Sequence, residues 1–305
     1  MVVKKYNWGI DLGGTKVEGV ILERPSNKVI ARERIATEQQ HGYRHILGRI
    51  KAVVDLLSEN TGLKPTCLGI GTPGTIDNKK QTLKNANTVC LNGRPLRKDL
   101  SDLLGIEVLS ANDANCFALA ETTLGIVPDV VPDAKVVFGV IMGTGVGGGV
   151  VINGKVINGL HGIAGEWGHS LLDENGVPCY CGKRGCVETI IAGPALQRYY
   201  AELSGNEKKL QDIVKLHHNG EDAAATKTIN RLLFNFGKAL GPIINLLDPD
   251  AIILGGGVGN IDLLYSHGPE EVSKHIFNHE LNTPILKPKL GDSAGVFGAA
   301  MLVEE

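Results

Sequence analysis

Two stretches of the chain share one plan: an apolar run, a glycine-rich turn and a second apolar run. The first is residues 8–22, WGIDLGGTKVEGVIL, and the second is residues 137–152, VFGVIMGTGVGGGVVI. Each pattern predicts a β-hairpin whose turn is made of backbone rather than side chain. Because the two stretches are spaced about 130 residues apart, they predict two domains built from the same unit.

Between and after these hairpins, helical patterns alternate with short apolar runs. Apolar residues at helical spacing predict helices over 43–57 and 226–247. A capping residue, Asn112 or Asp113, predicts a helix over 114–124, and a run of small residues predicts one over 294–302. Buried strands are expected over 67–71, 108–110 and 251–254. We expect a bend at Gly241-Pro242 and an irregular chain over 160–188. Strands alternating with helices are typical of an α/β protein, and without a long linker the domains should pack with a cleft between them.

Composition excludes several partners. A net charge of −2 gives no broad field to attract nucleic acid or anionic lipid. The longest uncharged apolar stretch, residues 136–152, contains six glycines and is short for a membrane span. No signal-peptide pattern opens the chain, so its six cysteines favour reduced thiols or a metal over a disulfide framework. We therefore expect a cytoplasmic protein with no membrane or nucleic-acid partner.

The first glycine turn carries groups that suit a phosphate. Asp11 can hold a hydrated Mg²⁺ ion, and the backbone of Gly13 and Gly14 can approach a phosphate closely. Thr15 and Lys16 follow, within reach of phosphate oxygens. For this loop alone, a tight hairpin turn with an incidental acid is the alternative.

The second glycine turn formally matches two nucleotide motifs, and both matches fail on context. Residues 143–148 fit GxGxxG, but a strand rather than a helix follows, so we reject an NAD site. Residues 149–155 fit most of a P-loop, but Val156 replaces the Ser or Thr that would bind Mg²⁺. In a second domain of the same plan, this turn could hold the β- and γ-phosphates from the opposite side of the cleft.

Four residues of metal-ligand type lie within eighteen positions: His169, Cys179, Cys181 and Cys186. A Cys₃His set satisfies tetrahedral Zn²⁺ without an open position, as expected of a structural site. Free thiols or a disulfide are the alternatives. We favour zinc because Cys179 and Cys181 are too close for a relaxed bridge and the compartment is reducing.

Taken in order, these motifs resemble the ROK family of sugar kinases and repressors, within the actin-like, Hsp70-like ATPase superfamily. The motifs are DLGGT at 11–15, GTPG at 71–74, NDAN at 112–115, GTGVGGG at 143–149, GEWGH at 165–169, CYCGKRGC at 179–186 and LGGG at 254–257. The resemblance implies a two-domain actin-like (ribonuclease H-like) α/β fold with an interdomain cleft and a structural zinc loop holding the same four ligands. We expect a smaller domain over 1–119 plus 292–305 and a larger one over 120–291.

The resemblance also assigns a role to Asp113. From the residues alone, a helix cap and a catalytic base fit this carboxylate about equally. The resemblance implies the base, which would take the hydroxyl proton of a hexose as the γ-phosphate of ATP is transferred. It implies that the sugar is held by Gly71, Asn87, Asn112, Asp113, Glu166, His169 and Glu188. It implies that ATP and Mg²⁺ are held by Asp11, Gly13, Gly14, Thr15, Lys16, Gly143, Thr144, Gly145, Gly147, Gly255, Gly256 and Gly257.

The substrate is expected from the finer resemblance. Residues 84–88, 91–93 and 179–183 look especially like bacterial ROK fructokinases, whereas 112–119 and 143–149 are also close to N-acetylglucosamine kinases. We expect a kinase acting on the 6-hydroxyl of fructose, with glucose and mannose as further substrates; an N-acetylglucosamine or N-acetylmannosamine kinase is the alternative. A sugar-responsive ROK regulator without its DNA-binding domain is an alternative of another class, disfavoured because Asp11 leaves no room before it for a helix-turn-helix. The family resemblance suggests a homodimer.

Overall fold

The computed structural model describes residues 5–278 and 280–304. The chain forms two compact units. Unit 1 takes residues 1–129, 149–164 and 289–305, and unit 2 takes residues 130–148 and 165–288. Both units are α/β, as the alternation of apolar patterns predicts.

The first sheet has the strand order β3-β2-β1-β4-β7. Its strands are β1 (Tyr6–Leu12), β2 (Lys16–Glu23), β3 (Lys28–Ala36), β4 (Cys67–Thr72) and β7 (Glu107–Asn112). β1, β2 and β3 pair antiparallel, whereas β1, β4 and β7 run parallel. The glycine turn at residues 13–15 therefore joins two antiparallel strands, which confirms the first predicted hairpin.

The second sheet has the order β10-β9-β8-β11-β12. Its strands are β8 (Val136–Met142), β9 (Val146–Ile152), β10 (Lys155–Val156), β11 (Ala251–Gly255) and β12 (Ile285–Leu286). When the strands of each sheet are numbered in chain order, both sheets have the strand order 3-2-1-4-5. The repeat seen in the sequence is thus a repeat of sheet topology.

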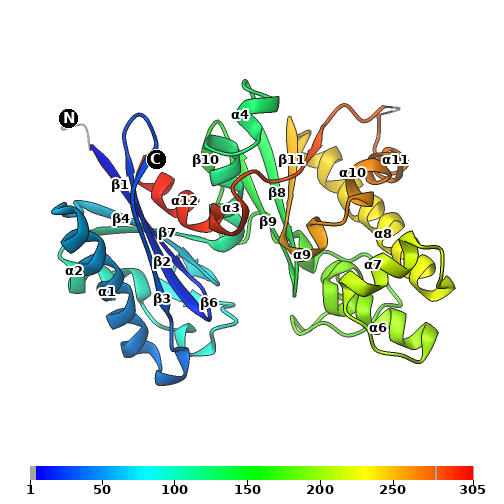
Figure 1. Ribbon diagram of the computed structural model, residues 1–305, viewed down its shortest axis with the longest axis horizontal. Helices are drawn as coiled ribbons and strands as arrows, with labels where there is room; N and C mark the ends of the chain where they lie inside the picture. The colour runs from blue at the N-terminus through cyan, green and yellow to red at the C-terminus, as the bar shows by residue number, and fades with distance from the viewer. Residues whose placement is uncertain (1–4, 279, 305) are drawn as a thin grey trace. The chain divides into compact units, whose positions relative to one another are not determined.

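Helices cover both faces of the first sheet (Figure 1). α1 (Tyr43–Thr61) buries Ile46, Ile50, Val53 and Leu57 at helical spacing, and it runs one turn beyond the predicted end. The other face carries α12 (Ala294–Met301), whose alanines and glycines allow a close approach: a Cβ on Gly9 of β1 would lie 2.4 Å from the backbone nitrogen of Ala300. The remaining elements within residues 5–126 and 289–304 are β5 (Thr75–Asp77), β6 (Thr82–Lys84), α2 (Leu96–Leu104), α3 (Asp113–Thr123) and the 3₁₀ helices η1 (Gln39–His41), η2 (Val89–Leu91), η4 (Gly291–Ser293) and η5 (Leu302–Glu304).

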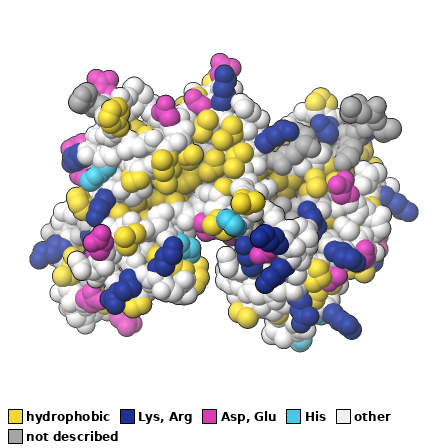
Figure 2. Space-filling view, turned by 180° about the vertical axis from the view of Figure 1, so that it is seen from behind, with side chains coloured by type: hydrophobic (Ala, Val, Ile, Leu, Met, Phe, Trp, Pro, Cys, Tyr) yellow, Lys and Arg dark blue, Asp and Glu magenta, His cyan; other side chains and the backbone are white. Residues whose placement is uncertain are grey.

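The longest helix of unit 2 is α8 (Ala223–Leu247), capped by the Asp222 carboxylate and continuous through Pro242. The residues around it form α5 (Glu188–Ile191), α6 (Gly193–Ser204), α7 (Leu210–His218), α9 (Gly256–Gly259), α10 (Leu263–Ser266), α11 (Gly268–Ser273) and η3 (Trp167–His169), while α4 (Val127–Val130) lies where the chain leaves unit 1. None of the helices in residues 5–278 and 280–304 is long and apolar enough to cross a membrane. On the face drawn in Figure 2, acidic and basic side chains are interspersed on each unit, as the small net charge leads one to expect.

Candidate active site

Three parallel strands of the first sheet end beside one another. Asp11 on β1 is in register with Gly71 on β4, and Thr72 on β4 is in register with Asn112 on β7. The carboxyl ends of parallel strands are where open α/β sheets bind ligands. The fold therefore brings the predicted residues Asp11, Gly71 and Asn112 to one edge, with Asp113 next in the chain.

Asn112 is the cap of α3. Its Oδ1 accepts the backbone N–H of Asn115 at 2.8 Å, and Asp113 occupies the first helical position. Asp113 Oδ1 accepts the adjacent N–H of Ala114, at 2.8 Å. The sequence left open whether Asp113 caps α3. In the structure its neighbour Asn112 is the cap, so the Asp113 carboxylate is not needed to start the helix.

The environment of Asp113 suits a proton acceptor. Asp113 keeps a solvent-exposed surface that a ligand can reach, although protein surrounds it closely enough to desolvate the carboxylate. The protein around the carboxylate raises its pKa above the usual range by desolvation, and the bond from Ala114 N–H opposes that shift. A raised pKa brings a carboxylate closer to the pH at which general bases work best.

Asp11 is half-buried and lies near Asp113. Desolvation raises the pKa of Asp11 to about 6, and the negative charge of Asp113 adds to the shift, while Lys16 opposes it. A carboxylate whose pKa is raised by burial and by a neighbouring carboxylate is a place where a divalent cation would be favourable. The geometry thus fits the predicted Mg²⁺ role of Asp11.

The first turn is held by its own backbone and by the end of β3. The N–H of Gly13 donates to Lys16 O at 2.9 Å, and the Thr37 hydroxyl donates to Gly13 O at 2.7 Å. Thr15 is exposed at the tip. The ammonium of Lys16 lies 3.4 Å from Glu18, a fully buried carboxylate, so Lys16 is partly engaged within the sheet.

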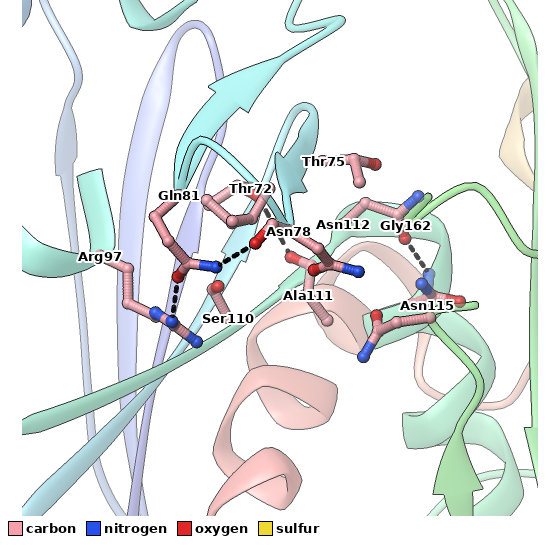
Figure 3. A pocket seen from close by; sticks show the side chains of 12 residues that line it. Thr72, Thr75, Asn78, Gln81, Arg97, Ser110, Ala111, Asn112, Asn115 and Gly162 are labelled. Carbon is pink, nitrogen blue, oxygen red and sulfur yellow. Dashed lines mark hydrogen bonds between the residues drawn. The ribbon is translucent and has the colours of Figure 1, made fainter. Parts of the chain in front are cut away.

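Asn112 also lines a small polar cavity of about 100 Å³. Figure 3 shows Asn112 and Asn115 on one side of it, with Gln81 and Arg97 hydrogen-bonded to each other on the opposite side. The buried Asn115 Oδ1 has no hydrogen-bond partner among residues 5–278 and 280–304. Sequence reasoning did not identify this cavity, because its lining comes from five separate segments.

The predicted sugar residue Asn87 is exposed on the loop after β6. The Asn92 side chain fastens this loop by bonding both the N–H and the C=O of Ala86, each at 2.9 Å. The buried Thr88 lies close to the first turn, since a Cβ on Gly14 would be 3.5 Å from its hydroxyl. Asn87 precedes Thr88 in the chain and is therefore near the first glycine turn.

In unit 2, the second turn opens onto a cavity of about 880 Å³. Gly143 and Thr144 line it together with Gly257, so three of the predicted nucleotide residues meet there. Gly256 adopts a φ of 80°, and a Cβ there would lie 2.3 Å from Met142 O, so only glycine fits beside β8. Gly255 is the last residue of β11, and the glycines after it begin α9 rather than a flat loop.

The same cavity is lined by α7 and the residue before it, through Lys209, Lys215 and His218. These side chains were missed at the sequence level. The signal was present as a basic run over residues 208–218, which is the kind of pattern that accompanies anionic ligands.

The four predicted metal ligands also meet in unit 2. One ligand atom from each of His169, Cys179, Cys181 and Cys186 lies within 4.8 Å of all the others. The Cys179 Sγ to His169 Nδ1 distance and the Cys181 Sγ to Cys186 Sγ distance are both 3.6 Å. A tetrahedron with Zn–S bonds of about 2.3 Å has edges of about 3.8 Å, so these atoms fit a zinc ion.

His169 points Nδ1 at the cysteines and Nε2 at Tyr180. The Nε2 to Tyr180 hydroxyl distance is 2.9 Å, and the two rings meet edge to face with centroids 5.1 Å apart. The sequence predicted that this second nitrogen would serve the sugar. In this structure the Tyr180 hydroxyl occupies that position, and since Tyr180 is 80% exposed, a sugar could displace it.

Two carboxylates flank the metal cluster in the chain. Glu166 is half-buried at the start of η3, and Glu188 is half-buried at the start of α5. Glu188 Oε2 accepts the backbone N–H of Val146 in the second turn at 3.0 Å. A carboxylate predicted to bind sugar therefore also contacts the loop predicted to bind phosphate.

The comparisons with known proteins agree with this arrangement. The profile of the ROK family matches residues 7–305. The chain belongs to the ROK family. An N-acetyl-D-glucosamine kinase from Vibrio parahaemolyticus is 36% identical over 306 residues, which cover 97% of this chain and 98% of that protein.

Solved ROK structures share the fold. A ROK hexokinase from Thermus thermophilus superposes with a TM-score of 0.86 at 28% identity, covering 97% of both chains. A ROK family glucokinase from Streptomyces griseus, solved with glucose and AMPPNP, superposes with a TM-score of 0.77 at 27% identity, covering 97% of this chain and 98% of that one. The ROK family lies in the actin-like ATPase superfamily, so the predicted actin-like α/β fold is confirmed.

Proposed function

We propose that this ROK protein is an ATP-dependent sugar kinase that phosphorylates N-acetylglucosamine, with Asp113 as catalytic base. The observation that carries the proposal is the strand edge of unit 1. There Asn112 caps α3, which leaves the exposed Asp113 carboxylate available beside the Mg²⁺ candidate Asp11. Matching ROK relatives named as sugar kinases support the reaction class.

Phosphoryl transfer requires the protein mainly to align the two substrates and to neutralise charge. Transfer of the γ-phosphoryl group passes through a loose transition state, so the donor phosphate must be held in line with the attacking hydroxyl and its charge must be neutralised. Asp113 would accept the hydroxyl proton late in the reaction. Asp11 would hold the Mg²⁺ ion, which would supply positive charge to the phosphates, while the backbone of Gly13 and Gly14 and the Thr15 hydroxyl would face the phosphate oxygens.

Unit 2 would supply the nucleotide site. A cavity of about 880 Å³ is within the usual range for small-molecule sites, and it begins at the turn formed by Gly143 and Thr144. The phosphates would lie at that turn and the nucleoside would extend toward Gly257 and α7. Lys209, the residue before α7, and Lys215, in the last turn of α7, would face the anionic ligand.

The proposed sugar substrate differs from the one expected from the sequence. Fructose was expected, but the relatives that match at 35–36% identity over nearly the whole chain are named N-acetyl-D-glucosamine kinases. They favour the alternative, an N-acetylated hexosamine, over fructose. The hydroxyl attacked would be the 6-hydroxyl. Asn87, Asn112 and the carboxylates Glu166 and Glu188 would orient the ring.

A structural Zn²⁺ ion belongs to the proposal. His169 would bind it through Nδ1, and Cys179, Cys181 and Cys186 would bind it as thiolates. The ion would supply a rigid link across a segment with little regular structure, fixing Glu166 and Glu188 on either side. A homodimer, expected from the family resemblance, remains a prediction.

A coupled assay tests the function. Purified protein with Mg·ATP should show turnover that depends on added sugar, with kcat/KM for N-acetylglucosamine above those for N-acetylmannosamine, glucose, mannose and fructose. Asp113→Asn should lower kcat by a factor of about 10² to 10⁴ while sugar binding is retained. Asp102→Asn removes an exposed carboxylate on α2 and serves as the charge-matched control. Near-normal turnover of Asp113→Asn would refute the role of the base, and fructose as the best substrate would restore the original expectation.

A further inference from the structure

The second glycine turn is shaped by contacts with its surroundings as well as by its own backbone. Within the turn, the N–H of Gly143 donates to Gly145 O at 2.9 Å. From outside, the N–H of Gly193 at the start of α6 donates to Gly143 O at 2.8 Å. The segment between residues 186 and 193 is therefore attached to the first residue of the turn.

Glu188 holds the other side of the same turn. Its Oε2 accepts the N–H of Val146 at 3.0 Å, across 42 positions of sequence. The fit is tight, since a Cβ on Gly145 would lie 2.5 Å from this oxygen. Glu188 follows Cys186 by two residues, so a short, partly helical segment connects a metal-ligand candidate to the turn.

The opposite end of the metal cluster contacts the turn as well. Trp167, two residues before His169, donates its indole N–H to Gly147 O at 2.9 Å. A Cβ on Gly168 would lie 1.9 Å from Val146 O, which shows how closely η3 passes the turn. Val146 and Gly147, the first residues of β9, are thus contacted by both chain segments that flank the metal ligands: the one before His169 and the one after Cys186.

We propose that Glu188 is a positioning residue for the turn Gly143–Val146, and that the Cys₃His loop sets the nucleotide affinity of unit 2 through it. The inference rests on the proposed function, which makes this turn a phosphate site. It differs from the sugar role predicted for Glu188, because it assigns Oε2 to the turn and leaves Oε1 to meet a sugar hydroxyl. Holding the turn in its binding shape before the ligand arrives avoids an ordering cost on binding.

The first experiment measures Mg·ADP binding by calorimetry in the absence of sugar. Glu188→Ala should weaken binding about tenfold, the value of one hydrogen bond to a charged group. Glu188→Gln keeps a carbonyl oxygen in reach of Val146 N–H and should stay within about threefold of wild type. Glu174→Gln removes an exposed charge from the same loop and should leave binding unchanged. If Glu188→Ala does not fold, Glu188→Ser, too short to reach Val146, takes its place.

A double-mutant cycle separates positioning from direct contact. The Gly145→Ala methyl group would collide with Glu188 Oε2, so it should weaken Mg·ADP binding in wild type. In the Glu188→Ala background that collision is absent, and the same substitution should have little further effect. A methyl group that instead blocks the phosphate directly would weaken binding equally in both backgrounds.

Metal removal provides the third arm. Protein stripped of metal by a chelator should bind Mg·ADP more weakly than the loaded protein, and readdition of Zn²⁺ should restore it, whereas Glu188→Ala should respond much less to either treatment. The inference is overturned if Glu188→Ala binds within twofold of wild type, if Glu188→Gln is as weak as Glu188→Ala, or if the cycle is additive. Wild-type protein that binds no Mg·ADP would instead refute the proposed function itself.

Discussion

Replacing Asp11 by Asn should stabilise the ligand-free protein, and only above the pH at which Asp11 ionises. Burial and the neighbouring Asp113 disfavour the charged form of Asp11 and raise its pKa from 3.8 to about 6. A carboxyl group with a raised pKa in the folded state opposes folding once it is charged. Asn has nearly the same shape and carries no charge, so it removes that opposition.

The magnitude follows from the shift. A change of about 2 pKa units corresponds to about 3 kcal/mol, and partial solvent exposure of Asp11 reduces this to about 2 kcal/mol. Below about pH 4, Asp11 is protonated in both folded and unfolded chains, and the variant and wild type should be about equally stable. The stability advantage of Asp11→Asn should grow between about pH 4 and pH 6 and stay constant above that.

The assay is urea unfolding at a series of pH values without nucleotide or divalent cations. The chain has two tryptophans, Trp8 in unit 1 and Trp167 in unit 2, both buried. In a shared Trp167→Phe background, Trp8 fluorescence reports the unfolding of the unit that contains Asp11. Mg²⁺ added at pH 7.5 should stabilise the wild type more than Asp11→Asn. The cation would offset the repulsion between the Asp11 and Asp113 carboxylates, and the variant lacks one of the two.

Asp222, in unit 2, is the control of opposite sign, and the unfolding of that unit is followed through Trp167 in a Trp8→Phe background. A hydrogen bond from Tyr200 lowers the pKa of Asp222, so its contribution to stability is present at neutral pH and is lost as the pH falls through the lowered value. Asp222→Asn should therefore destabilise at pH 7 and become neutral in acid. The reasoning about Asp11 fails if Asp11→Asn is less stable than wild type at pH 7.5, or if its advantage is the same at pH 4 and pH 7.5.

Three further outcomes are expected. Cys181→Ser should lower the zinc content measured by atomic absorption and weaken sugar binding by calorimetry; unchanged values would argue against a Cys₃His site. Gly69→Ala should lower the melting temperature, because its Cβ would lie 1.8 Å from Ala299 O, and a cost of about 1–3 kcal/mol is typical of overpacking. Gly48→Ala, in open space on α1, should raise stability by about 0.5–1 kcal/mol, and a loss at Gly48 would contradict the helix assignment.

The duplicated sheet could be predicted because glycine turns between apolar runs are local patterns. The sequence also located α1 and α8 from apolar residues at helical spacing, α3 from the capping residue before it, and α12 from its run of small residues. β3 was missed. Its exposed residues and its charged Arg32, Glu33 and Arg34 hide the strand pattern, and only pairing with β2 makes it part of the sheet.

The site divides in the same way. Residue types and spacing were sufficient to gather the four metal-ligand candidates, because a tetrahedral ion constrains its ligands closely. The contact between Glu188 and Val146 could not be read from the chain, since it joins a side chain to a backbone N–H 42 positions away. The choice of Asn112 over Asp113 as the cap of α3 was equally open, because both residues suit that position.

β7 passes directly into α3, with Asn112 as the last strand residue and Asp113 as the first helical one. No loop residue separates β7 from α3, so the backbone at Asp113 cannot move to bring the side chain to a substrate bound in a different position. One glycine inserted at this junction would turn Asp113 about 100° around the helix axis and abolish any reaction that depends on it. Efforts to redirect such a protein to a different sugar should therefore alter the β5–β6 hairpin, where exposed residues 78–81 form the connection, and leave the strand–helix junction intact.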